Sequence, residues 1–345
     1  MAPAAQVIPE PVQALIKFIA SDAFVKAAIF PGAMFISILG LFVVWYERKL
    51  LARIMLRIGP FHVGKYGGTL QLIADAVKFL SKEFIVPENA RAWLFTLAPM
   101  LAVVVDTMPF AFLPFSPKWV IFPSDIGLLL FFLFIAISPI PLILAGWASG
   151  SKYSLIGMVR FAFQVFAYEI PFFLALTGVV VMARSFNLIE IVEAQSVMPF
   201  IIPQIIGFIA FFITMIAETE RIPFDIPTAE QELVEGWKVE YSASGFLMLM
   251  LAQYTKTAAL AVLTVLLYLG GWHGPAIPGV PAEILQPFWV IVKTLILLTV
   301  ILIMRGIYPR ITIEKILELG WRVLIPMTLI NLLIVAVIIS WPAIF

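Results

Sequence analysis

A series of long, uninterrupted apolar segments limits this chain to very few folds. A helix needs about 20 mostly apolar residues to cross a bilayer, whereas a transmembrane barrel has short strands of alternating polarity. The sequence contains about eight such segments: residues 28–46, 92–113, 125–146, 156–183, 198–218, 243–271, 285–304 and 322–341. We therefore expect an all-α, polytopic membrane protein with about eight transmembrane helices, forming a single domain over residues 1–345.

Composition supports this class and excludes several others. Hydrophobic residues make up 62% of the chain and charged residues only 12%, whereas a soluble domain has about 25% charged residues. A net charge of +1 provides no basic excess for binding nucleic acid. The chain has no cysteine and two histidines, His62 and His273, which are far apart in sequence. We therefore expect no disulfide, no iron–sulfur cluster and no metal site within this chain.

Lysine and arginine are distributed asymmetrically among the loops between these segments. Sixteen of them lie in or beside the first, third, fifth and seventh loops, eight in the first loop alone. Because cytoplasmic loops carry the excess of basic residues, these loops are predicted to be cytoplasmic and both termini to lie on the outer side. No signal peptide is expected. Residues 11–20 fit either a short interfacial helix or a disordered start.

The first loop, residues 47–91, is predicted to contain an amphipathic helix. Apolar residues recur through 70–80 at helical spacing, which places Asp75, Lys78 and Lys82 on the wetter side. One interpretation is a helix lying at the membrane interface with its lysines reaching toward water. The other is that this loop and its helix frame an entrance from the bilayer into the protein.

The fifth loop, residues 218–242, is unusually acidic. Aromatic and apolar residues are interleaved with its acids, and Pro223 and Pro227 stiffen it. A solvated acidic loop is one interpretation. In a packed loop, however, burial and mutual repulsion raise some carboxyl pKa values, so that these groups can exchange protons near neutral pH. The seven acids are Glu218, Glu220, Asp225, Glu230, Glu232, Glu235 and Glu240.

Four ionisable residues lie well inside the predicted spans, away from their ends: Asp106, Glu169, Lys256 and Lys293. Placing a charge at the bilayer centre costs at least about 2.5–3.5 kcal/mol, so each is a candidate functional residue. The alternatives are a static intramembrane ion pair and a side chain that reaches the interface from near a helix end.

Several sequence blocks together resemble one known family. They include Glu47-Arg48-Lys49, Arg57-x-Gly59-Pro60 and, most specifically, Ala217-Glu218-x-x-Arg221-x-Pro223-Phe224-Asp225. Similar blocks extend from about residue 47 to 326. In these blocks the chain resembles the membrane subunit at the junction of respiratory complex I, the NuoH or NADH-dehydrogenase subunit 1 family.

The resemblance implies a non-redox-centre subunit of a proton-translocating NADH:quinone oxidoreductase, an electron-transport translocase. Its substrate would be a quinone such as ubiquinone, or a similar lipid-soluble carrier. Its partners would be iron–sulfur and quinone-site peripheral subunits, small membrane subunits and antiporter-like subunits. Its location would be the inner (cytoplasmic) membrane of a prokaryote, among membrane lipids.

The resemblance also implies roles for matching residues. Those implied to shape the quinone chamber are Arg48, Arg57, Asp75, Lys78, Arg221, Phe224 and Asp225. Those implied to relay protons and couple them to quinone reduction are Glu169, Glu218, Glu230, Glu232 and Glu240. The chain departs from the family at Gln253, where many members carry a glutamate. It also has extra acids, Glu220 and Glu235, where the family often has neutral residues.

Three other interpretations remain open. The chain could anchor an energy-converting membrane hydrogenase, which needs no quinone, although the segment from Arg221 to Asp225 favours a quinone-type complex. It could instead belong to a ferredoxin- or deazaflavin-dependent relative that reduces a carrier such as methanophenazine. A stand-alone transporter is disfavoured because the sequence contains no clear internal repeat.

Overall fold

The computed structural model describes residues 21–64 and 67–340, and all the regular structure in these ranges is helical. The segment 11–20 lies outside the described residues. Within the described ranges, seven helical stretches are long and apolar enough to cross a membrane. They are Asp22–Ile54, with α2 (Asp22–Phe24) and α3 (Ala33–Ile54); Ala92–Phe112, with α5 (Ala92–Thr107); Gly127–Ala148, with α6 (Gly127–Ile137) and α7 (Pro139–Ala148); α8 (Lys152–Ala183); α12 (Ala243–Tyr268); α13 (Ala282–Ile307); and Ile313–Ser340, with α14 (Ile313–Glu318) and α15 (Ile325–Ser340).

The expected span 198–218 is shorter than the sequence predicts. Its helix, α10 (Ile205–Glu218), has 14 residues, and turns occupy residues 200–204 before it. At about 1.5 Å per residue α10 covers about 21 Å, less than the roughly 30 Å hydrocarbon core. Pro203 has no backbone N–H to donate, which accounts for the late start of this helix.

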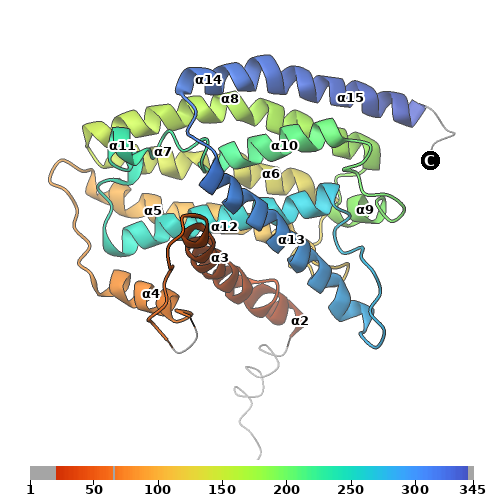
Figure 1. Cartoon of the computed structure of the whole chain (residues 1–345), viewed down its shortest axis with the longest axis horizontal. Coiled ribbons are helices and arrows are strands. Elements are labelled where there is room, and N and C mark those ends of the chain that lie inside the picture. The colour runs from red at the N-terminus through yellow and green to blue at the C-terminus, as the bar shows by residue number, and fades with distance from the viewer. Residues whose placement is uncertain (1–20, 65–66, 341–345) are drawn as a thin grey trace, which may run out of the picture.

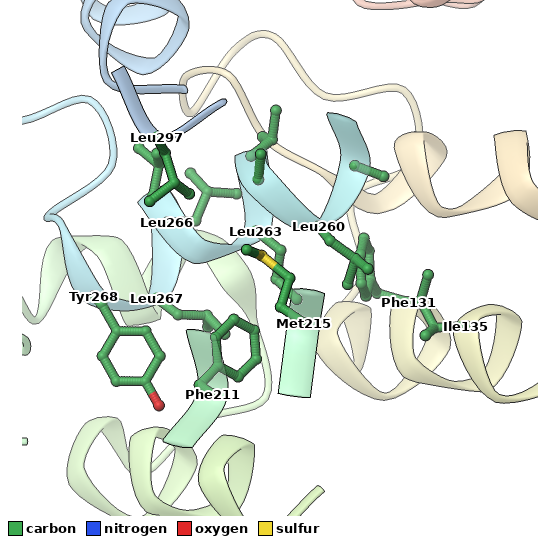
Figure 2. Close-up of a cluster of buried hydrophobic side chains, with 14 of the residues drawn as sticks. Phe131, Ile135, Phe211, Met215, Leu260, Leu263, Leu266, Leu267, Tyr268 and Leu297 are labelled. Carbon is green, nitrogen blue, oxygen red and sulfur yellow. The ribbon is translucent and has the colours of Figure 1, made fainter. Parts of the chain in front are cut away.

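Helix α12 forms the centre of the molecule. Every residue from Thr255 to Tyr268 is buried, because α3, α5 and α13 pack around this helix. Figure 2 shows its leucines meeting Phe211 and Met215 of α10, with Phe131 and Ile135 of α6 beside them. In Figure 1, α15 runs alongside α8 at the edge of the molecule, and these two helices are in extensive contact.

The basic loops meet at one end of the bundle. Contacts join the first loop to the third, the third to the fifth, and the seventh to the fifth. They are the hydrogen bond from the Arg91 N–H to the Ala148 carbonyl (2.9 Å), the ion pair Arg160–Glu232 and the ion pair Arg310–Asp225 (2.8 Å). These contacts place the four loops on the same end, and the side of the membrane that this end faces stays a prediction.

The acidic loop is packed against the bundle. Its two short helical turns, α11 (Glu230–Leu233) and the 3-10 turn Gly236–Lys238, lie against α8. A glycine makes this approach possible, because a Cβ at Gly157 of α8 would lie 2.7 Å from the backbone nitrogen of Trp237. The packed-loop interpretation is therefore correct for the part of the loop around Trp237.

The amphipathic helix of the first loop is present as α4 (Gln71–Ser81), but the predicted orientation of one side chain is wrong. Asp75 does not lie on the wetter side: its side chain is only 16% exposed, and it pairs with Arg48 at 2.5 Å. The exposed residues of α4 include Ile73, Val77 and Leu80. Arg48 attracts Asp75 toward the protein, so that this apolar face is turned outward.

Candidate functional site

A buried carboxylate between two arginines forms the centre of the candidate site. Glu47 of α3 accepts a hydrogen bond from Arg221 of the acidic loop at 2.6 Å and pairs with Arg305 of α13 through its other oxygen. Glu47 and Arg221 are buried, and Arg305 is more accessible. Two positive charges against one negative charge leave a net positive centre, which favours an electron-rich ligand.

Arg221 has two further contacts. Its Nε donates to Thr257 of α12 at 3.3 Å, and its guanidinium lies 4.8 Å from the ring centre of Tyr254. Burial lowers the pKa of Arg221, and Tyr254 partly opposes this shift. Arginine nevertheless remains protonated in proteins, so Arg221 is a fixed cation of the site.

A cavity of about 490 Å³ opens beside this centre, between α3 and the loop segment 57–60. We call it the entrance cavity. Arg48, Arg57, Tyr254 and Arg305 are among the residues that line it. Two of the predicted chamber residues, Arg48 and Arg57, therefore face this space. Asp75 and Lys78 do not line it, and Asp75 reaches it only through its ion pair with Arg48.

A second, smaller cavity of about 120 Å³ lies on the other side of Tyr254 and Arg305, which line both cavities. We call it the loop cavity, because the acidic loop supplies most of its wall. Its ionisable lining residues are Glu220, Arg221, Asp225, Glu230, Lys238, Tyr254 and Arg305. The entrance cavity therefore adjoins a second cavity that is lined by the carboxyl groups of Glu220, Asp225 and Glu230.

Asp225 and Phe224, two predicted chamber residues of the acidic loop, lie in different surroundings. Asp225 lines the loop cavity, where it accepts a hydrogen bond from Arg310 at 2.8 Å and another from Thr228. Phe224 lines neither cavity; it is buried with its ring 5.2 Å from that of Tyr168, in an edge-to-face arrangement. Phe224 thus fixes the loop on α8.

A second buried ion pair lies deeper in the bundle. Lys256 of α12 donates to Glu218 at the end of α10 at 2.8 Å, and both side chains are buried. Asp106 of α5 is also buried and lies within electrostatic range of Lys256. Lys256 therefore lies within electrostatic range of three carboxyl groups, because Glu220 is also near it. Glu169 of α8 is half-buried, forms no ion pair among the described residues, and lies within electrostatic range of Glu218 and Lys256.

The other predicted relay residues do not join this cluster. Glu230 and Glu232 are exposed, and Glu232 pairs with Arg160 of α8. Glu230 lines the loop cavity, whereas Glu240 is half-buried and lies outside both cavities. The structure thus brings Glu169 near Glu218 and leaves Glu230, Glu232 and Glu240 toward the surface of the loop.

Lys293 has a structural explanation. Its ammonium donates to the backbone carbonyls of Leu269 (2.7 Å), Gly271 (2.9 Å) and His273 (2.6 Å), just beyond the end of α12. A cation that satisfies carbonyls at a helix C-terminus is a capping interaction. Among the described residues, no group of three or more His, Cys, Asp or Glu side chains is arranged to hold a metal ion.

Sequence reasoning did not single out Glu47, Tyr254 or Arg305. Glu47 and Arg305 end apolar spans, where charged residues usually meet water. Only the fold shows that α3 and α13 bring them to the same point. Glu47 has two signals in the sequence: it ends an apolar span, and it belongs to the block Glu47-Arg48-Lys49 that the chain shares with the family.

The fold and the site define a polytopic helical membrane protein with a buried charged centre where its basic loops meet. The family model described as NADH dehydrogenase matches residues 26–336. A curated relative from Syntrophobacter fumaroxidans (strain DSM 10017 / MPOB), named as an H-type subunit of NADH-quinone oxidoreductase, is 40% identical over 309 residues, which is 87% of this chain and 91% of the relative. The chain belongs to the NADH dehydrogenase (NuoH) family, as the sequence blocks predicted.

Proposed function

We propose that this chain is the membrane subunit of a proton-translocating NADH:quinone oxidoreductase-type complex, in which it forms the quinone entry chamber. The observation that carries the proposal is the buried centre of Glu47, Arg221 and Arg305 between two adjoining cavities. The relative's name, which makes it part of an NADH-quinone oxidoreductase, supports the same conclusion.

Entry of the substrate follows from the first loop. The exposed apolar side chains of α4, Ile73, Val77 and Leu80, suit contact with lipid, so that a quinone can pass from the bilayer beside this helix. Arg57 and Arg305 line the entrance cavity and are hydrogen-bond donors for the carbonyl oxygens of a quinone headgroup. Reduction to quinol consumes two electrons and two protons, and the electrons come from redox centres of partner subunits.

Coupling follows from the position of the acidic loop. A change of charge on the bound headgroup acts first on Arg305 and Glu47, which line the entrance cavity, and through Glu47 on Arg221 at the loop cavity. Asp225 and Glu218 flank this arginine in sequence, and Glu218 leads to Lys256, Asp106 and Glu169. In low-dielectric surroundings such charge changes move protons between neighbouring groups. Within this path Glu169 and Glu218 relay protons, and Glu230, Glu232 and Glu240 exchange them at the loop surface.

The proposed assembly includes peripheral iron–sulfur subunits, small membrane subunits and antiporter-like subunits in a prokaryotic inner membrane. Purification of a tagged chain in mild detergent, with identification of its partners and a quinone-analogue reductase assay, tests this. We expect iron–sulfur and antiporter-like subunits to co-purify, with quinone-dependent, inhibitor-sensitive turnover. The donor accepted, whether NADH, ferredoxin or a deazaflavin, assigns the branch. Partners that evolve or consume hydrogen without quinone would replace this proposal with the hydrogenase interpretation.

A further inference from the structure

Glu220 is a buried acid without a direct ion-pair partner among the described residues. Only 7% of the residue is exposed. Its carboxylate accepts a hydrogen bond from the indole Nε1 of Trp237 at 2.9 Å and one from the amide of Gln253 at 3.5 Å. Both donors are neutral, so they stabilise the carboxylate without cancelling its charge.

The backbone is arranged to hold Glu220 in this place. Glu220 has a φ of 50°, in the left-handed region that residues with a side chain rarely adopt. A conformation of this kind is strained and persists only where the surrounding structure enforces it. Trp237, which is fully buried against α8, is the residue that anchors the carboxylate.

The charges around Glu220 come from three elements. Lys238 and Asp225 belong to the acidic loop, Lys256 to α12, and the buried Asp106 to α5. Burial raises the pKa of Glu220 to about 7, whereas the Trp237 hydrogen bond and the two lysines act in the opposite direction. Arg221, Glu230, Tyr254 and Arg305 are the other ionisable groups that line the loop cavity with it.

Glu220 adjoins two parts of the site. It lines the loop cavity, together with Arg221 and Tyr254. It is also hydrogen-bonded to Gln253, which lines the same cavity and lies one turn before Lys256 on α12. Lys256 in turn holds Glu218. No other acid of the fifth loop both lines the loop cavity and is hydrogen-bonded to Gln253.

We infer that Glu220 is a proton-binding site through which the loop cavity exchanges protons with the buried Glu218–Lys256 pair. A proton from water in the cavity adds to a Glu220 carboxylate oxygen and gives the neutral carboxyl. The same O–H bond breaks when the proton leaves toward Glu218 or back to the cavity. The burial of Glu220, its neutral hydrogen-bond donors and its place at the loop cavity support proton binding, while its use in quinone-coupled transport rests on the proposed function.

Glu235 provides a matched control. It is an acid of the same loop and also has a positive φ (80°), but it is half-exposed and does not line the loop cavity. Glu220→Gln and Glu235→Gln each remove one negative charge at a left-handed position. Glu220→Gln retains an amide oxygen that can accept the Trp237 N–H, which favours retention of the fold.

The experiment is a pH titration of the purified complex by infrared difference spectroscopy, which follows the carboxyl stretch of protonated acids, from about pH 5 to about pH 9. We expect a buried carboxyl that titrates near pH 7 in the wild type and in Glu235→Gln, and its loss in Glu220→Gln. Identical carboxyl titrations in the wild type and Glu220→Gln would overturn the inference.

If Glu220→Gln does not assemble, Gln253→Glu provides a second test of proton binding at Glu220. This near-isosteric change places a second carboxylate beside Glu220, so the Glu220 midpoint should rise by about one pH unit or more. An unmoved midpoint would overturn the inference.

Because the infrared titration needs no turnover, it decides proton binding even if the complex proves not to reduce quinone. The pH profile of quinone reduction, unchanged in Glu235→Gln and flattened near pH 7 in Glu220→Gln, then tests the role in transport.

Discussion

Glu47 and Lys293 show that the partners of a charged residue decide its role in this fold. Both are charged residues in or beside apolar spans. Glu47 lies in the central ion cluster with Arg221, whereas the Lys293 ammonium caps the carbonyls beyond α12. A side chain's partners depend on helices that are distant in sequence. Burial cost therefore identifies residues that need a partner but does not identify the partner.

Glu169→Gln is expected to lower the rate of proton-coupled quinone reduction by about tenfold or more while the complex still assembles. Gln has the same shape but cannot bind and release a proton, and proton-transfer groups typically contribute about 10²–10⁴-fold. The measurement is quinone reductase activity and proton uptake per assembled complex in sealed vesicles. Lys293→Gln serves as the control and should change coupling much less. Normal rate and stoichiometry in Glu169→Gln would refute its role.

Asp225→Asn is expected to reduce coupled activity several-fold without preventing assembly. The variant leaves Arg310 without its carboxylate partner at the wall of the loop cavity, and unpaired charged groups are costly. Activity should be assayed beside the band of the intact complex on a native gel. An intact band with full coupled activity would count against a role for Asp225.

The pH dependence of stability gives a further residue-scale prediction for Glu220. Its pKa is raised from 4.5 to about 7, so the folded state binds more protons than the unfolded state between these values. Stability contributed by this group therefore falls as the pH rises through this window, by at most about 3 kcal/mol. Glu220→Gln should lose this dependence. Its Tm relative to the wild type should be higher at about pH 8 than at about pH 5. A constant difference in Tm would contradict the raised pKa.

At the scale of helices, a long apolar segment predicts well that a helix exists, and less well where that helix begins and ends. The expected span 92–113 is realised as Ala92–Phe112, whereas 198–218 keeps only the 14 residues of α10. Prolines account for this difference. A mean hydropathy does not register that proline lacks the backbone N–H that a helix needs. The spacing predicted for α4 is correct and its orientation is not, since Arg48 on another helix decides where Asp75 points.

The C-terminal end of α12 is expected to depend on Lys293. Lys293→Met removes three donors from the carbonyls of Leu269, Gly271 and His273. Unsatisfied buried carbonyls cost about 1–3 kcal/mol, so the Tm of the complex should fall by a few degrees while activity at low temperature persists. Lys118→Met, which removes an exposed ion pair with Glu283, is the control and should leave Tm nearly unchanged. An equal Tm in Lys293→Met and the wild type would show that the cap contributes little.

The position of α4 is expected to depend weakly on its ion pair. Asp75→Asn disrupts the contact with Arg48, which is partly exposed, so the loss in stability should be about 1 kcal/mol or less. Limited proteolysis of the loop 47–91 should nevertheless become faster, because α4 has no buried residues to hold it. Arg53→Gln, a charge change on the same loop without a predicted role, is the control. Equal cleavage rates in Asp75→Asn and the wild type would argue against this anchoring.

At the scale of the whole molecule, the placement of basic residues predicted a property that the structure displays. The odd-numbered loops lie together at one end, joined by Arg160–Glu232 and Arg310–Asp225. The two cavities and the charged centre lie at the same end. The two cavities meet at Tyr254 and Arg305. This meeting could not be predicted from sequence, because it depends on how α3, α12 and α13 cross.

Photolabelling of the purified complex with a photoreactive quinone analogue tests the central claim, a quinone chamber formed by this chain, most directly. We expect labelling of this chain on peptides that line the entrance cavity, around Arg57, Tyr254 and Arg305, with the label displaced by excess unlabelled quinone. Labelling confined to partner subunits, or labelling of this chain that unlabelled quinone does not displace, would contradict it.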